Sequence, residues 1–322
     1  MNIQSIQNIL KTKINTTGKM AKHSLVLLLA VASTQVAAHS RWMVPTHTIL
    51  SGEEAEVVAI DLSISNDIFH PDFALGGVPL KDVAILLAGE QLAKKPTPKD
   101  PGAAFRQQLA QSTKLEVVQP NGEITHSEAL INFGRKSTTA IELAQSGTYR
   151  VGVVQNPIYF TLFKDAEGNR GREFGKLKQV KASLPKGATD ISVMKVNNRV
   201  ETYITRNDLN TTALAVTGNG LELVFSGHPN ELFVKEKHTI QLLANGKPVA
   251  EGTEVKLTRE GTRHRNDREL IIATTDSKGF FELVIDRAGF YLLEVEIKVD
   301  ATEKGVNTER LGLYTTLEVN AE

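Results

Sequence analysis

The sequence consists largely of short runs of β-branched and apolar residues, each closed by turn-forming residues. Turns are indicated at Asn121-Gly122, at Asn245-Gly246 and before Gly279. Short strands spaced by such turns are typical of antiparallel β-sandwiches. The expected strands cover residues 55–64, 114–118, 148–154, 221–225, 238–243, 254–258, 269–275, 280–285 and 291–299. The predicted fold is therefore mainly β.

Two tandem sandwiches of the immunoglobulin-like or transthyretin-like kind are predicted, at residues 39–154 and 213–322. The second closes with Thr275-Asp276-x-x-Gly279 and then Gly289-x-Tyr291, a hairpin signature that is echoed at Gly147-x-Tyr149. A connecting region, residues 155–212, holds a polar segment at 164–178 that we expect to be a mobile loop. The strongest helical pattern covers residues 103–111, within a segment rich in proline and lysine.

The first 38 residues have the composition of a secretory signal peptide. Four lysines precede an apolar run at residues 25–32, and small residues end at Ala38. That run is much shorter than the roughly 20 residues of a membrane span, which disfavours the alternative of a membrane anchor. Translation could start at Met1 or at Met20. We expect cleavage after Ala38 and a periplasmic protein.

The residues after Ala38 number 284 and carry 33 basic and 37 acidic side chains, a net charge of −4. This balance argues against nucleic acid or an anionic membrane as the main partner. No second apolar segment reaches spanning length, so no membrane insertion is expected. Cysteine is absent, which excludes disulfides and thiolate chemistry but is compatible with export.

Cleavage after Ala38 would make His39 the first residue of the mature protein. Its free α-amine and ring Nδ1 could chelate one metal ion together, in the arrangement known as a histidine brace. Nitrogen donors of this kind suit copper, nickel or cobalt. A first-position histidine also arises by chance, so the pattern does not decide the matter. Trp42 either docks this terminus against the first sandwich or is simply the first core residue.

Further metal donors are less clearly marked, because the seven histidines of the mature chain form no zinc-binding or catalytic motif. His47 lies eight residues after His39. Asp67, His70 and Asp72 share one loop that could supply nitrogen and oxygen ligands. The alternative is an ordinary turn with a surface histidine. His228 is predicted in a turn, and His238 and His264 on the surface or on strands.

An enzyme is not expected, since the nucleophile elbow, the phosphate-binding glycine loop and the dinucleotide fingerprint are all absent. A histidine-brace copper monooxygenase acting on polysaccharide remains an alternative. It needs a flat surface rich in exposed aromatic side chains, whereas the chain has one tryptophan and five tyrosines.

The order of several short motifs resembles a bacterial family of periplasmic proteins. The family is named for a domain of unknown function and is often labelled a nickel- or cobalt-transport periplasmic component (NikM-like). The motifs are His39 with Arg41-Trp42 and Pro45, Asn66-Asp67-x-Phe69, Thr205-Arg206-Asn207, Gly220-Leu221-Glu222, His228-Pro229-Asn230, Asn245-Gly246-Lys247-Pro248, Gly261-Thr262-Arg263 and Thr275-Asp276-x-x-Gly279. The chain departs from the family pattern by carrying its loop histidine at His70 and a histidine, His264, where an aromatic residue is usual.

The resemblance implies a periplasmic, non-enzymatic protein tied to the uptake of a transition metal. The expected function is a metal-binding accessory of a nickel, cobalt or related uptake system, which holds an ion at His39 or passes it to a membrane transporter. A structural or interaction module built from tandem sandwiches is the main alternative.

Overall fold

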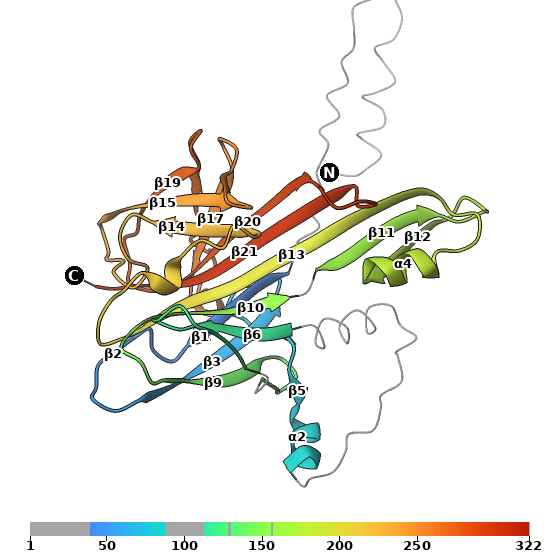
Figure 1. Ribbon diagram of the computed structural model, residues 1–322. Helices are drawn as coiled ribbons and strands as arrows, with labels where there is room; N and C mark the ends of the chain where they lie inside the picture. The colour runs from blue at the N-terminus through green and yellow to red at the C-terminus, as the bar shows by residue number, and fades with distance from the viewer. Residues whose placement is uncertain (1–38, 88–112, 128–129, 156, 322) are drawn as a thin grey trace, which may run out of the picture. The chain divides into compact units, whose positions relative to one another are not determined.

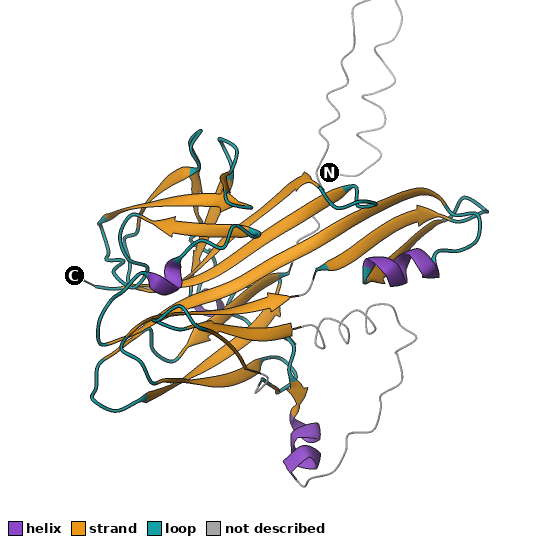
Figure 2. Cartoon of the chain, in the orientation of Figure 1, coloured by secondary structure: helices purple, strands orange, loops and turns teal. Residues whose placement is uncertain are grey.

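The computed structural model describes residues 39–87, 113–127, 130–155 and 157–321, and strands dominate it (Figure 2). The predicted signal peptide and the predicted helix at 103–111 lie outside these residues. The described helices are short: α2 (Leu80–Leu87), α4 (Leu177–Ser183) and two 3-10 turns, η1 (Thr212–Leu214) and η2 (Thr262–His264). No described helix is long and apolar enough to cross a membrane.

An eleven-stranded sheet forms the common floor of the described structure (Figure 1). Its main path runs β18-β17-β20-β21-β13-β10-β6-β7; β11 and β2 also pair with β13, and β12 pairs with β11. The bounds are β2 (Ile49–Leu50), β6 (Thr113–Val118), β7 (Ile124–Ser127), β10 (Gly147–Gln155), β11 (Ile158–Lys164), β12 (Arg170–Gly175), β13 (Thr189–Arg206), β17 (Glu254–Arg259), β18 (Ile271–Thr274), β20 (Gly289–Asp300) and β21 (Thr308–Val319).

Strand β13 joins the two halves of this sheet. It is 18 residues long, pairs antiparallel with β10 and runs parallel to β21 (Figure 1). Its buried end carries polar side chains that find partners across the strands. Thr202, for example, donates from Oγ1 to the carbonyl of Thr316 at 3.0 Å. The region predicted to connect two domains therefore contributes the strand that is hydrogen-bonded to both.

The first sandwich forms where a second sheet packs on the β10–β6 end of the floor. This sheet has the order β1-β3-β9-β8-β5, with β4 paired to β3. Its bounds are β1 (Ser40–Pro45), β3 (Glu56–Ser65), β4 (Phe73–Ala74), β5 (Val78–Pro79), β8 (Ile131–Asn132) and β9 (Ser137–Leu143). Alternate residues of β3, such as Val58, Ile60 and Leu62, are fully buried and meet Tyr149 and Val151 of β10 in one core. Period-two burial of this kind fixes the register of the strands.

The second sandwich forms where a third sheet packs on the β17–β21 end. Its strands are β14 (Leu221–Phe225), β15 (Lys237–Ala244), β16 (Lys247–Pro248) and β19 (Phe280–Val284). Ile240, Leu242 and Phe281 of this sheet share a core with Leu257 and Leu313 of the floor. The predicted fold class, mainly β with immunoglobulin-like sandwiches, is confirmed.

Each sandwich also contains a tyrosine corner, the device by which a tyrosine hydroxyl bonds to the backbone just upstream. The Tyr149 hydroxyl donates to the carbonyl of Gln145 at 2.8 Å, and the Tyr291 hydroxyl donates to that of Arg287 at 2.7 Å. Both tyrosines lie two residues after a glycine of positive φ, Gly147 or Gly289. Burial raises the pKa of both phenols. The sequence echo between the two domains thus corresponds to a repeated local structure.

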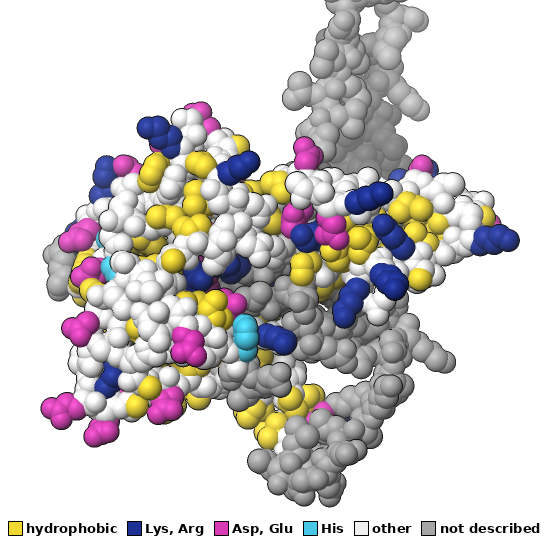
Figure 3. Space-filling model, in the orientation of Figure 1, with side chains coloured by type: hydrophobic (Ala, Val, Ile, Leu, Met, Phe, Trp, Pro, Cys, Tyr) yellow, Lys and Arg dark blue, Asp and Glu magenta, His cyan; other side chains and the backbone are white. Residues whose placement is uncertain are grey.

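The polar segment expected to be a loop, residues 164–178, instead contains strand β12 and the start of α4. Strand β12 pairs with β11 from Tyr159 opposite Gly175 to Lys164 opposite Arg170. The pairing is supported by Phe160 and Phe174, whose ring centroids are 4.8 Å apart. The prediction failed because β12 consists of glycines and charged residues around a single apolar side chain, Phe174, and so carries no strand pattern of its own. Figure 3 shows lysine and arginine side chains gathered over this part of the molecule.

Candidate functional site

His39 is the first residue that the structure describes, and it directly precedes β1. Its side chain is exposed, and its ring meets the ring of Phe73 edge-on, with 6.1 Å between centroids. Its carbonyl accepts a hydrogen bond from Nη1 of Arg41 at 3.1 Å, and the same nitrogen donates to the Tyr314 hydroxyl at 3.1 Å. The backbone of His39 is therefore tied to β21.

Strand β1 is held firmly from its first residue. Trp42 is 3% exposed and packs against Phe69, with ring centroids 5.8 Å apart, while Met43 is fully buried. Of the two interpretations of Trp42, the structure shows a core residue whose partner belongs to the 66–72 loop. A buried aromatic ring at this position stops the end of the strand from fraying.

Strand pairing brings His39 to the loop that holds three of the predicted ligands. Ser40 lies opposite Ser65, the last residue of β3, and Phe73 of β4 returns opposite Ile64. His39 therefore borders the loop between Ser65 and Phe73. Asp67, His70 and Asp72 follow His39 by 28 to 33 positions in the sequence. The register of β1 with β3 brings His39 and their loop to one end of the sheet.

Inside the loop, two aspartates have different partners. Nδ1 of His70 lies 3.3 Å from Oδ2 of Asp67, so this carboxylate can fix the ring and its tautomer. Asp72 accepts a hydrogen bond from the Ser65 hydroxyl at 2.6 Å and lies 3.5 Å from Nη1 of Arg135. His70 and Asp67 thus form a coupled pair, whereas Asp72 supports the base of the loop.

The second sandwich supports the loop from outside. The Thr262 hydroxyl donates to the carbonyl of Ile68 at 2.6 Å in a buried hydrogen bond. Arg268 donates from Nη2 to the carbonyl of Asn66 at 2.9 Å, and the same nitrogen lies 3.6 Å from Oδ1 of Asp67. Arg268, Asp67 and His70 therefore form one chain of polar contacts. Sequence reasoning missed this support, because Thr262 and Arg268 lie about 200 residues downstream.

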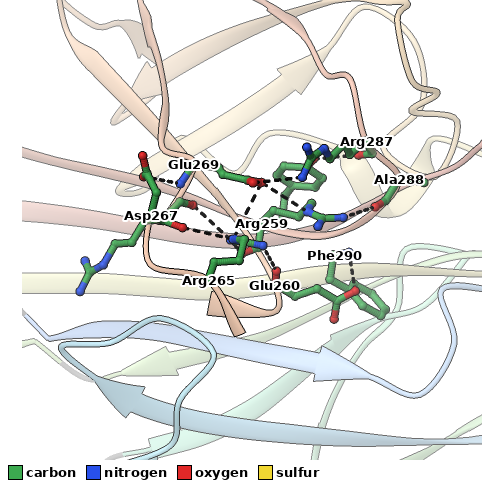
Figure 4. Close-up of polar contacts among 10 residues, drawn as sticks. Arg259, Glu260, Arg265, Asp267, Glu269, Arg287, Ala288 and Phe290 are labelled. Carbon is green, nitrogen blue, oxygen red and sulfur yellow. Dashed lines mark hydrogen bonds and ion pairs between the residues drawn. The ribbon is translucent and has the colours of Figure 1, made fainter. Parts of the chain in front are cut away.

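Arg265 shapes the loop between β17 and β18, residues 260–270, which is called the supporting loop below (Figure 4). Its guanidinium donates to the carbonyls of Arg259, Glu260, Asp267 and Arg268, and Nε lies 3.8 Å from Glu269. Glu269 also pairs with Arg287 at 3.0 Å. A guanidinium offers five N–H donors in a rigid fork, so a single side chain closes the loop and directs Thr262 and Arg268 toward residues 66–68.

An acidic residue that sequence reasoning missed lies behind the start of β1. The Ser40 hydroxyl bonds to Glu294 of β20, and burial raises the pKa of this carboxyl, with nearby Glu296 adding to the shift. Arg268 and Lys256 oppose the shift. Glu294 therefore adds a partly buried carboxyl next to the backbone of the residue that follows His39.

His47 does not reach this place. Strand β1 runs away from His39 for six residues, to Pro45 opposite Ile60, and His47 lies exposed beyond its far end. At about 3.4 Å per residue, six residues span roughly 20 Å. The structure separates His47 from the His39 end of the sheet because the intervening segment is an extended strand.

The described residues contain no group of three histidine, aspartate or glutamate side chains placed to hold a metal ion. Side chains alone therefore do not complete a metal site in this part of the chain. A site at His39 requires the α-amine, which exists only if the chain begins there.

His228 was predicted to be an ordinary turn residue, but it is 6% exposed and fully bonded. Its Nδ1 accepts from the backbone N–H of Asn230 at 3.1 Å, so the proton lies on Nε2. Nε2 is 3.0 Å from the Thr148 hydroxyl and 3.1 Å from the carbonyl of Asn210. Burial lowers its pKa. The ring links β10 to the segments on either side of β14, and its role here is structural.

The sequence from residue 36 to residue 299 matches the model of one protein family, described as a domain of unknown function, DUF4198. The chain belongs to the DUF4198 family. The match takes in His39, the 66–72 loop and the supporting loop around Arg265, whereas Tyr314 of β21 lies beyond its last matched residue. No curated protein matches the sequence.

Solved structures similar to this DUF4198 chain are distant. The D0-D1 domain of intimin is 9% identical, with 85% of this chain and 96% of that one covered at a TM-score of 0.20. A DUF3823 family protein from Bacteroides uniformis is 10% identical over 67% and 91%, at 0.21. Trypsin-activated alpha-2-macroglobulin from Escherichia coli is 11% identical over 87% and 23%, at 0.18. Scores this low carry no argument about function.

Proposed function

We propose that this DUF4198 protein is a periplasmic metal-binding accessory that holds a transition-metal ion as cargo at a mature N-terminus formed by His39. The α-amine and Nδ1 of His39 supply two donors, and His70 supplies a third. The observation that carries the proposal is the register of β1 with β3, which fixes His39 next to the loop that contains His70.

The contacts of His70 favour its use as a ligand. Asp67 engages Nδ1 at 3.3 Å, which leaves Nε2 as the nitrogen able to bind an ion. Metal-bound histidines usually have a carboxylate on the other ring nitrogen. Three nitrogen donors suit nickel, cobalt and copper better than magnesium or calcium.

The resemblance to nickel- and cobalt-transport components supports an uptake role. In that role the protein performs no chemistry on the ion and passes it to a transporter in the membrane. An exposed position at the edge of a sheet fits release to a partner better than a deeply buried site would.

The test is calorimetric titration of the processed protein with nickel, cobalt and copper salts. His39→Ala is expected to abolish tight binding, because it removes the imidazole and leaves a lone amine. His70→Ala is expected to weaken binding while leaving the His39 chelate in place. His126→Ala is the matched control, since His126 is an exposed histidine on β7, in the eleven-stranded sheet and not in the sheet of β1 and β3. Equal binding by all variants refutes the site.

A structural or interaction module is the second candidate. It is favoured by the lack of any three-ligand side-chain group among the residues described. In that case none of the three metals binds tightly to the protein that starts at His39, and the arrangement of the two sandwiches is the functional feature.

A further inference from the structure

The hairpin of β11 and β12, the helix α4 and the first residues of β13 form an arm beyond the two sandwich cores, defined here as residues 158–191. The hairpin is held by its ladder with β13 and by the Phe160–Phe174 contact. Helix α4 buries Val180 and packs on β11 and β12. The arm is therefore built from regular elements, and its surface side chains have defined positions.

Positive charge is concentrated on this arm. It holds seven basic and four acidic residues, a net charge of +3, although the residues after Ala38 together carry −4. Six of the basic side chains are exposed, and the described residues provide none of them with an ion pair. They are Arg170, Arg172, Lys176, Lys178, Lys181 and Lys186.

Two of the four acidic residues of the arm are engaged, and a third, Glu173, is half-buried. Asp190 lies 2.7 Å from Nζ of Lys164. Asp165 accepts hydrogen bonds from the backbone and the side-chain amide of Asn169, which lower its pKa. Only Glu167 is both exposed and without such a partner among the described residues. The six exposed cations are therefore left to interact with something outside the fold.

Exposed apolar side chains accompany the cations. Leu162 is 48% exposed and lies opposite Arg172 in the hairpin, and Ile191 is 43% exposed. The Arg172 guanidinium lies over the Phe174 ring, 5.9 Å from its centroid. Figure 3 shows apolar and basic side chains side by side on this part of the surface. Basic residues interleaved with apolar ones are the composition of surfaces that adsorb to anionic lipid.

We propose that the arm is a peripheral docking surface for a membrane rich in anionic phospholipid. The cations contact headgroup phosphates, and Leu162, which lies opposite Arg172, enters the headgroup boundary. The net negative charge of the whole protein does not prevent this contact. Electrostatic interactions at physiological salt decay over about 8 Å. A lipid surface in contact with the arm therefore interacts mainly with the arm's own net charge of +3.

This inference does not depend on the metal site. It gives the proposed accessory role a place of action, since adsorption by the arm would keep the protein at the membrane surface.

The test is co-sedimentation of the processed protein with vesicles of phosphatidylcholine alone or with about one-third phosphatidylglycerol. Binding is expected only to the anionic vesicles and is expected to fall as salt rises. Each lysine near such a surface contributes about 1 kcal/mol, or about fivefold. Lys178→Gln with Lys181→Gln should therefore reduce partitioning by about 25-fold. Both lysines are exposed on α4, and glutamine preserves helix propensity.

Two matched variants complete the design. Lys178→Arg with Lys181→Arg keeps the charge and should restore binding. Lys247→Gln with Lys278→Gln removes the same charge from two exposed positions of the second sandwich, one in β16 and one in a turn, and should leave binding unchanged. The proposal is overturned if anionic vesicles do not bind at low salt, or if the two glutamine pairs lose binding equally. It is also overturned if only a soluble polyanion such as heparin is bound.

Discussion

Replacing Trp42 with alanine tests whether the start of β1 is held as tightly as its burial indicates. A tryptophan buries about 150–250 Å², and about 25 cal/mol per Å² gives roughly 4–6 kcal/mol as an upper bound. Measured losses for Trp→Ala in cores are about 3–5 kcal/mol. Because Trp42 is 3% exposed and contacts Phe69, we expect a loss of about 3–4 kcal/mol in the free energy of unfolding.

The assay is urea denaturation followed by far-ultraviolet circular dichroism, since Trp42 is the only tryptophan and its fluorescence vanishes with the substitution. Trp42→Phe is the control. It should retain more than half of the stability that Trp42→Ala loses, because an aromatic ring still faces Phe69. A loss below about 1 kcal/mol, the size of a surface substitution, would refute the reasoning. It would mean that the burial of Trp42 does not hold the start of β1 in place.

Further predictions concern the polar contacts. Arg268→Gln should weaken nickel affinity about 10-fold or more, as loss of ligand support usually does, whereas Arg263→Gln, on the exposed turn next to it, should not alter the titration. His228→Ala should lower the free energy of unfolding by about 1–3 kcal/mol at neutral pH, because buried partners lose their hydrogen bonds. Burial lowers the pKa of His228 below the usual histidine value of about 6.5, so protonation favours the unfolded chain. Its contribution is complete above that value and is lost as pH falls through the lowered pKa, and a denaturation series should show a flatter pH dependence in the variant. Tyr149→Phe removes both bonds to Gln145 and should cost about 1–3 kcal/mol in the same assay.

The strands that sequence reasoning located are those whose pattern is local. Residues 221–225 were predicted as a strand and are β14, because consecutive β-branched and apolar residues end at clear turn residues there. Strands β13 and β21 were missed. The buried face of β13 holds Thr202 and Glu201, which bond to the carbonyl of Thr316 and to Tyr203, and β21 buries the polar residues Thr315 and Thr316. A single-sequence pattern counts such residues as polar.

The candidate site likewise contains residues that the sequence identifies and residues that only the structure identifies. His39, Asp67 and His70 were identified from residue type and position, and the register of β1 with β3 places them at one end of a sheet. The supporting residues Thr262 and Arg268 were not identified, because their role follows from the packing of one sandwich loop on another. Long-range contacts of that kind leave no periodic trace in a sequence.

The central claim is that one α-amine and one imidazole of the same residue bind the ion together. The most direct measurement compares metal titrations of two proteins that differ by a single residue at the N-terminus, one starting at His39 and one starting at Ala38. We expect tight nickel, cobalt or copper binding by the first and a loss of at least 100-fold, about 2.7 kcal/mol, in the second, whose amine is displaced from the ring. Equal affinity of the two proteins would contradict it.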